Sequence, residues 1–546
     1  MAAQNTLLAI TSFTQKAIPQ LLIKRGHLHT TIVRDHGHIW GITSSDQLKS
    51  CYNPLKRNES FCKCMSRPQQ IECILPEDTV VKHAKLVDVV REQLTNDIHD
   101  NLRQVSLYFR ILRQKGFQVS ADVFKLFKGK DGKFLEDLKD DIRGLMELYE
   151  ASHLCIEGEN ILDEAATFSS HMLQKELNFL DDKEAKIVRY TLENPHRRNL
   201  TCFSLPNSTK EIDFDFDFGF GFDSTILKEL LELEQTKVQS IHMMEINEIL
   251  RWWKDLGLGQ DLNLARNQPL KWYVVPMVSL PNPNLSQQRI DLTKALSFIY
   301  IMDDIFDIYG TLNELTLLTE AVNRWDISNI QHLPYYIKSS FRALYDTTNE
   351  IACRVSEKHG FNPIKSLQRA WGRLCEAFLM EAKWLSSGHI PNTEEYLKTG
   401  EVSSGVHVFL VHMFFLLGDG AIEEHASLID DNYNIVSSVS KILRLSDDLE
   451  GEQDNQNQHG RDGSYVKCFL MEHEYSSTKI ARDYVIEIIS DTWKCLNKEC
   501  LSPNPFSDNF LKGAINLARL VPSMYRYNHN NNNSFDQIEE YIKSIL

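Results

Sequence analysis

The chain has 546 residues, of which 42% are hydrophobic and 25% are charged. This length exceeds what one hydrophobic core usually serves, so we expect two domains. The formal net charge of −16 argues against nucleic acid or an anionic membrane as the main partner. An anionic substrate would therefore need metal ions or a local group of arginines at its binding site.

The N-terminal 34 residues contain no Asp or Glu, and they carry scattered Ser and Thr together with four basic residues: Lys16, Lys24, Arg25 and Arg34. This composition is typical of an organelle transit peptide. A disordered basic tail is the alternative. We favour a transit peptide within residues 1–50, which predicts a plastid protein, with the cytoplasm as the alternative location.

The eleven cysteines are an odd number spread from Cys51 to Cys500. This distribution indicates a reducing compartment without a disulfide framework. Cys62 and Cys64 could supply half of a zinc site, but no second pair follows at metal-binding spacing. We therefore expect no zinc centre. We also find no apolar run of transmembrane length, so no membrane contact is expected.

Helical patterns dominate from about residue 78 onward. The stretches "LVDVVREQL" (86–94) and "DIRGLMELYEASHL" (141–154) repeat apolar residues at three- and four-residue spacing, which is typical of amphipathic helices. Strand-like alternation occurs clearly in "DFDFDFGFGFD" (213–223), but no partner strand lies nearby. We interpret this segment as a low-complexity linker. The predicted fold class is all-α, with helical domains at 70–212 and 224–546.

The stretch "FIYIMDDIFDIYG" (298–310) places Asp303, Asp304 and Asp307 at the end of a hydrophobic helix. On a helix, residues four apart share a face, so Asp303 and Asp307 continue a stripe that contains Leu296 and Tyr300. Like charges four apart destabilise a helix, and a cation would offset this. Carboxylate oxygens suit Mg²⁺, which often shares its ligand shell with substrate phosphates. A solvated helix end without function is the alternative.

Two features of one apolar helix, between residues 403 and 412, bear on the candidate metal site. Ser403, Ser404 and Gly405 are poor helix formers and predict a weak point in an apolar helix. His407 and His412 follow in that helix, and we expect them to be packed or to lie at the rim of a pocket.

A second acidic cluster, "VSKILRLSDDLEGEQD" (439–454), ends another apolar helix and precedes a polar loop. Asp447 and Asp448 lie three and four residues after Arg444. Two acidic helix ends that face each other could hold divalent ions, while Arg444 and a loop residue such as Arg461 could bind a diphosphate. Two unrelated surface patches remain the alternative. The stretch "NHNNNNS" (528–534) predicts a loop before the last predicted helix.

Five stretches stand out in chain order: "LYEASHLCIEGENILDEAATF" (148–168), "RWWKDLGLGQDLNLARNQPLKWY" (251–273), "SFIYIMDDIFDIYGTLNELTLLTEAVNRWD" (297–326), "SSGVHVFLVHMFFLLG" (403–418) and "DGSYV" (462–466). In the same order, they resemble motifs of plant class I terpene synthases, and the likeness covers most of residues 78–527. The resemblance implies an N-terminal α-barrel-like domain and a C-terminal catalytic α-bundle. It also implies three Mg²⁺ ions, with Mn²⁺ as a substitute, and a monomer that ionises a prenyl diphosphate.

The resemblance also assigns residues. It makes Asp303 and Asp307 direct metal ligands, adds Asp304 to the aspartate-rich motif, and makes Asp447 the first residue of a second metal motif. It implies Arg266 and Arg444 at the diphosphate and Tyr525 as an aromatic residue of the pocket. It places a helix break beside the cavity at Ser403–Gly405, so that a backbone carbonyl can face the cation.

The sequence departs from the family pattern at several positions. Gln268 stands where the second Arg of an Arg-x-Arg element is usual, and Val275 stands where many relatives have a pocket Trp. The second metal motif has Gly451 and Asn455 where a hydroxyl and a Glu are expected, so Glu452 or Asp454 could serve instead. The N-terminal tandem-arginine motif is absent, and the N-terminal domain looks shortened.

These departures favour an acyclic alcohol as product: linalool from geranyl diphosphate, or nerolidol from farnesyl diphosphate. An acyclic or cyclic terpene hydrocarbon synthase and an inactive prenyl-diphosphate-binding relative are the alternatives. Chain-elongating prenyl transfer needs a second motif of the same kind, and cyclisation by protonation needs a D-x-D-D run. The sequence contains neither.

Overall fold

The computed structural model describes residues 101–114, 117–193, 195, 224–258, 267–419, 429, 434–451, 464–501 and 505–524. Several expectations fall outside these residues. They include the transit peptide at 1–50, the Cys62–Cys64 pair, the helix at 86–94, the linker at 213–223 and the loop at 528–534 with the helix after it.

The described residues form helices throughout, and their extended pairing is limited to an isolated bridge between Lys128 and Phe134. The all-α prediction is therefore confirmed. The first group of elements comprises α3 (Leu102–Gln114), η1 (Ala121–Phe127), η2 (Glu136–Asp140), α4 (Ile142–Ser152), α5 (Asn160–Glu176) and α6 (Asp182–Glu193).

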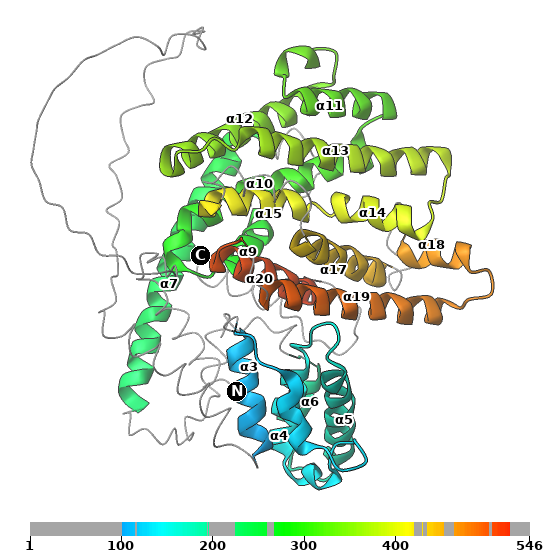
Figure 1. Ribbon diagram of the computed structural model, residues 1–546. Helices are drawn as coiled ribbons and strands as arrows, with labels where there is room; N and C mark the ends of the chain where they lie inside the picture. Colours follow the sequence, from blue (N-terminus) through cyan, green and yellow to red (C-terminus); the bar gives the residue numbers. More distant parts are fainter. Residues whose placement is uncertain are drawn as a thin grey trace, which may run out of the picture. The chain divides into compact units, whose positions relative to one another are not determined.

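The second group is longer and is coloured green to red in Figure 1. It comprises α7 (Ser224–Leu256), α9 (Pro269–Ser279), η5 (Pro283–Leu285), α10 (Ser286–Asp304), η6 (Ile305–Tyr309), α11 (Leu312–Arg324), η7 (Ile327–Ile330), α12 (Tyr335–His359), α13 (Ile364–Ser387), α14 (Thr393–Ser403), α15 (Val406–Leu417), α17 (Asn434–Gly451), α18 (Tyr465–Glu472), α19 (Thr478–Leu501) and α20 (Asp508–Met524).

The first group has its own buried core, in which α4 packs against both α3 and α5. Helix α4 realises the amphipathic pattern expected at 141–154. Asp141 caps it by accepting a hydrogen bond from the Gly144 amide at 2.8 Å. The buried Arg110 of α3 pairs with Glu147 of α4 at 2.9 Å, so the charge that α3 brings into the core is neutralised.

The second group is organised around α10, which contacts α7, α9, α12 and α15. Almost every residue of α10 is buried, including polar ones. A helix that is covered on all sides belongs to a core rather than to a surface. Because α10 carries the aspartates at its C-terminal end, the bundle fixes the direction in which they emerge.

Buried charges on α10 are paired with residues of neighbouring helices. The Nε of Arg289 donates to Glu245 of α7 at 2.9 Å, and both residues are 1% exposed. Tyr273 of α9 donates its hydroxyl to the same carboxylate. Asp291 accepts from the Nη2 of Arg354 on α12 at 2.6 Å. These pairs join α10 to three other helices.

One stretch, Thr393–Leu417, is long and apolar enough to cross a membrane, with a mean hydropathy of 1.5 in its most apolar window. Our expectation that no run reaches this length was therefore wrong. That window is 78% buried inside the fold, and the helix is interrupted between Ser403 and Val406. Both features are those of a core helix pair.

We predict that Arg289→Met lowers the free energy of unfolding by about 3–5 kcal/mol, because Glu245 would be left buried without its partner. Chemical denaturation monitored by circular dichroism measures this. The matched control is Arg324→Ala, which removes an exposed pair with Glu320 and should cost less than about 1 kcal/mol. Equal shifts in the two variants would contradict the role of the buried pair.

Candidate active site

The aspartate-rich stretch begins in α10 and ends in the π-helix η6. Asp303 is half-buried, Asp304 is buried and Asp307 is exposed. The sequence predicted regular α-helix through all three residues, whereas the structure widens the last turn. A single π turn is rare and occurs often at functional sites, because it changes the direction of the side chains that follow.

The end of the π turn is fixed by Gly310, whose amide donates to the carbonyl of Ile305 at 2.9 Å. A Cβ at this position would come within 2.3 Å of the Leu315 side chain, so a larger residue would require the buried Leu315 to move. Helix α11 then starts at a capping box between Thr311 and Glu314. The acidic turn is thus held between two well-defined helices.

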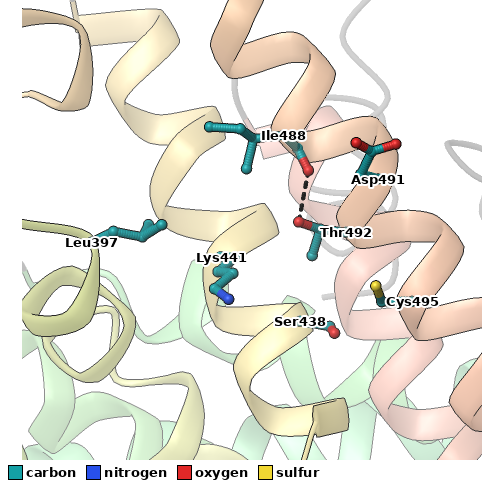
Figure 2. A pocket seen from close by; sticks show the side chains of 7 residues that line it. All are labelled: Leu397, Ser438, Lys441, Ile488, Asp491, Thr492 and Cys495. Carbon is teal, nitrogen blue, oxygen red and sulfur yellow. Dashed lines mark hydrogen bonds between the residues drawn. The ribbon is translucent and has the colours of Figure 1, made fainter. Parts of the chain in front are cut away.

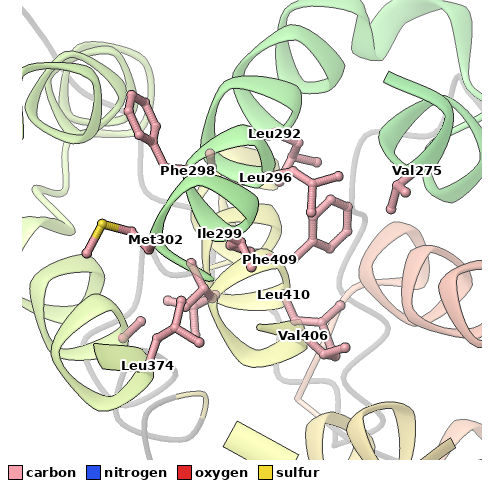
Figure 3. Close-up of a cluster of buried hydrophobic side chains, with 14 of the residues drawn as sticks. Val275, Leu292, Leu296, Phe298, Ile299, Met302, Leu374, Val406, Phe409 and Leu410 are labelled. Atoms are coloured by element: carbon pink, nitrogen blue, oxygen red, sulfur yellow. The ribbon is translucent and has the colours of Figure 1, made fainter. Parts of the chain in front are cut away.

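Apolar and aromatic side chains continue from the acidic end into the bundle. Figure 3 shows Val275 of α9, Leu296 and Ile299 of α10, and Phe409 of α15 among the buried side chains. The ring of Trp272 stacks on Tyr300 with centroids 6.3 Å apart. The predicted apolar stripe leading to Asp303 is therefore present, and Val275 is part of this cluster.

The predicted weak point at Ser403–Gly405 is a real helix break. Helix α14 ends at Ser403, and Gly405 adopts a left-handed conformation with φ 72° before α15 begins. A Cβ on Gly405 would lie 2.4 Å from a methyl carbon of Ile299. The break therefore lies against α10, one turn before Asp303.

The two histidines of α15 are packed in the core. His407 contacts the carbonyl of Ala370 at 3.0 Å, and His412 contacts the carbonyl of Val408 at 2.7 Å. Burial lowers the pKa of each to about 4, so both are neutral near pH 7. The expectation that they are packed is confirmed.

Arg444, on α17, lies in a cluster of polar residues that the sequence did not reveal. Its Nε and Nη2 donate to the hydroxyl of Tyr396 at 3.0 and 2.7 Å. That hydroxyl donates to Asp448 at 2.8 Å. Nη2 also lies 3.6 Å from Glu381 of α13, which accepts a hydrogen bond from Ser403. A guanidinium group is thus held by side chains from three helices.

The charges of this cluster favour ionised Arg444. Burial opposes its charge, but Tyr396, Glu381 and Asp448 outweigh that effect, so the pKa of Arg444 lies well above its usual range. Burial raises the pKa of Tyr396 well above its ordinary value, which keeps the phenol protonated. Tyr396 can therefore donate and accept at the same time.

Asp447 and Asp448, the two acids of the second motif, differ in their exposure to solvent. Asp447 is exposed, whereas Asp448 is buried and also accepts from the amide of Tyr465 at 2.9 Å. Asp448 therefore serves the cluster around Arg444. This leaves Asp447 as the exposed carboxylate of the pair.

Helix α13 contacts both motifs. Phe378 packs on Phe306 of the π turn with ring centroids 5.6 Å apart. Glu381, one turn further along, lies beside Arg444. A shared helix therefore couples the position of the aspartates to that of Arg444. Sequence reasoning missed Tyr396 and Glu381, although Tyr396, Gly400 and Ser403 have the spacing of a common helix face.

Four predicted site residues lie outside the described part of the chain: Arg266, Glu452, Arg461 and Tyr525. Within the described part, no group of three or more His, Cys, Asp or Glu side chains is assembled to hold a metal ion. A shallow groove of about 260 Å³ lies elsewhere, between α14, α17 and α19 (Figure 2), and neither acidic motif contributes to it.

Comparison with known proteins identifies the family to which this chain belongs. Residues 254–495 match the profile of the "Terpene synthase family, metal binding domain", and residues 82–192 match the "Terpene synthase, N-terminal domain". An (E)-nerolidol synthase of Cannabis sativa is 47% identical over 82% of this chain and 80% of its own. The chain belongs to the terpene synthase family. It is a lyase that acts on prenyl diphosphates.

Other terpene synthases are also similar. The chloroplastic S-(+)-linalool synthase of Arabidopsis thaliana is 40% identical over 83% of this chain and 78% of its own, and the chloroplastic tricyclene synthase Oc15 of Antirrhinum majus is 43% identical over 82% and 76%. The solved isoprene synthase of grey poplar (Populus x canescens), in complex with three Mg²⁺ ions and dimethylallyl-S-thiolodiphosphate, has a TM-score of 0.77 and 33% identity, and covers 86% of this chain and 88% of that one.

Proposed function

We propose that this terpene synthase ionises a prenyl diphosphate with the help of Mg²⁺ and captures the allylic cation with water. The product is an acyclic alcohol: linalool from geranyl diphosphate, and nerolidol when farnesyl diphosphate is offered. The observation that carries the proposal is the position of Asp303 and Asp307. They lie at the accessible end of a buried helix whose preceding turns are lined by apolar and aromatic side chains.

The residues present fit a hard divalent cation. Asp303 and Asp307 supply carboxylate oxygens from one turn of chain, and Mg²⁺ takes few protein ligands because it keeps waters and substrate oxygens. We propose these two aspartates and Asp447 as ligands, with Asp304 and Glu452 completing the two motifs. When bound, Mg²⁺ stabilises the negative charge of the departing diphosphate. Mn²⁺ can replace it.

The chain's own groups bind, orient and shield the substrate. Arg444 binds the diphosphate, and we assign Arg266 and Arg461 to the same anion. The cluster around Ile299, Val406 and Phe409 excludes water from the hydrocarbon tail. We assign Tyr300 and Tyr525 to the pocket wall, because aromatic rings there would favour a cation. Water then adds at the tertiary carbon, and its proton leaves with the diphosphate.

Three features favour an acyclic product. Gln268 replaces an arginine at the N-cap of α9, Val275 replaces a pocket aromatic, and the tandem-arginine motif is absent. A weaker hold on the diphosphate disfavours its return to the tertiary carbon, which a geranyl chain needs before it can cyclise. The named products of the nerolidol and linalool synthases support this proposal. Because a tricyclene synthase is also among the relatives, a hydrocarbon product is the alternative.

We further propose an N-terminal domain at 70–212, a linker at 213–223 and a catalytic domain at 224–546. The separate cores of the two helix groups support this division. We propose that the protein acts as a monomer without nucleic acid or membrane contacts.

We predict that Asp303→Ala and Asp307→Ala each lower kcat/KM for geranyl diphosphate by about a hundredfold or more, because stabilisation of the leaving group is lost. Steady-state assays of released diphosphate measure this. The matched control, Asp483→Ala, removes an exposed carboxylate on α19 and should retain activity. Near-normal turnover in both test variants would rule out the metal-site assignment.

We predict that geranyl diphosphate with Mg²⁺ gives mainly linalool, and that chelation of the metal abolishes the product. Gas chromatography of the extracted volatiles measures both. A difference of about 1.4 kcal/mol between competing barriers changes a product ratio tenfold, so a few side chains decide the outcome. Limonene, pinene or another ring as the main product would overturn the acyclic assignment and leave the family assignment intact.

We predict that residues 1–60 direct a fluorescent fusion protein to plastids, because this segment opens with an acid-free stretch rich in hydroxyl groups. The chloroplastic names of relatives support this address. Confocal microscopy in leaf cells measures the outcome. Fluorescence confined to the cytosol would refute it and favour farnesyl diphosphate as the substrate.

A further inference from the structure

The guanidinium group of Arg444 is held along one edge. Both Nε and Nη2 donate to the hydroxyl oxygen of Tyr396, at 3.0 and 2.7 Å. Within the described residues, Nη1 of Arg444 has no hydrogen-bond partner. A planar guanidinium has a fixed fork of donors, so fixing one edge also fixes the orientation of the other.

The hydroxyl of Tyr396 is itself fixed. It donates to Oδ1 of Asp448 at 2.8 Å, and the other oxygen of that carboxylate accepts from the amide of Tyr465 at 2.9 Å. Because its proton is directed to Asp448, its lone pairs are available to Arg444. The chain of hydrogen bonds thus runs from the start of α18 through α17 and α14 to the guanidinium.

The closeness of α14 to Arg444 has a second cause. Gly400 lies one helical turn after Tyr396, and a Cβ there would meet Cγ of Arg444 at 3.0 Å and Nε at 3.3 Å. Glycine therefore lets the backbone of α14 approach the stem of Arg444, while Tyr396 holds its head. Glycine inside a helix is unfavourable, so this position needs a packing reason.

We propose that Tyr396 is a positioning residue that orients Arg444 for the diphosphate, with Gly400 providing the space. This inference rests on the proposed role of Arg444. Tyr396 engages the Nε and Nη2 edge and leaves Nη1 to bind the anion. An arginine held in this way loses less conformational freedom on binding, so the diphosphate binds more tightly.

The direct test uses Tyr396→Phe and measures the binding of inorganic pyrophosphate with Mg²⁺ by isothermal titration calorimetry. We expect affinity to fall about tenfold, since a hydrogen bond to a charged group is lost. The KM for geranyl diphosphate should rise by a similar factor, with a smaller change in kcat.

The chain offers a matched control in Tyr273→Phe. Tyr273 is also a buried phenol that donates to a carboxylate, and its acceptor Glu245 also pairs with an arginine, Arg289. Both variants should lower the melting temperature, but Tyr273→Phe should leave pyrophosphate affinity within about twofold of wild type. Gly400→Ala provides a second test, because it crowds Arg444 without removing any hydrogen bond, and it should weaken binding several-fold.

The possible outcomes distinguish the proposed role of Arg444 at the diphosphate from the proposed positioning role of Tyr396. If Arg444→Ala leaves pyrophosphate affinity unchanged, the assignment of Arg444 fails. If Arg444→Ala weakens binding but Tyr396→Phe and Gly400→Ala bind as wild type, Tyr396 is merely structural and this inference is overturned. If Tyr396→Phe does not fold, the pyrophosphate affinity of Gly400→Ala decides whether the proposal holds. In support of the proposal, Tyr396→Phe should lower pyrophosphate affinity by less than a further twofold in an Arg444→Ala background. The reason is that both substitutions act through the same guanidinium group.

Discussion

A charged side chain inside an apolar bundle must be paired, and this constraint organises the catalytic half of the molecule. Arg289 reaches Glu245, Asp291 reaches Arg354, and Arg444 reaches Tyr396 and its carboxylate neighbours. Each pair joins different helices, so satisfying the charges also sets how the helices lie against one another. An uncompensated buried charge would lower the free energy of unfolding by several kcal/mol, whereas a misplaced methyl group lowers it by less.

The buried pairs differ in the role that we assign to them: Arg289 is structural, and Arg444 is proposed to bind the diphosphate. The Arg289 pair is closed on all sides and holds α10 in place. The Arg444 cluster has the same chemistry, but it lies at the end of α17 beside the exposed Asp447. A guanidinium with one edge occupied is stable in the fold and still has a donor for an anion. The difference between the two clusters lies in their position in the bundle.

Departures from regular helix occur where the chemistry is proposed. The π turn at Ile305–Tyr309 re-aims Asp307, and the left-handed Gly405 breaks the α14–α15 run against Ile299. Helix α13 touches the π turn through Phe378 and the arginine cluster through Glu381.

The sequence by itself determined the helical class, the aspartates at the end of an apolar helix and the weak point at Ser403–Gly405. These features depend on local patterns: the spacing of apolar residues, a cluster of acids, and residues that disfavour helix. The packed state of His407 and His412 followed from the apolar helix around them. The family motifs are the basis on which Arg444 and Asp447 are proposed for the site, because their neighbours in the chain are distinctive.

Only the tertiary structure decided that Asp448 is buried and that Tyr396 and Glu381 hold Arg444. Tyr396 and Glu381 are far from Arg444 in the chain, and no local pattern says that they will meet it. The π turn was also not predicted, because the local pattern indicates a regular α-helix through Asp307. The apolar run at Thr393–Leu417 could equally be a membrane span or a core helix by composition, and burial against its neighbours decided between them. Pairing and burial are properties of packed helices, and the sequence specifies them only through the fold.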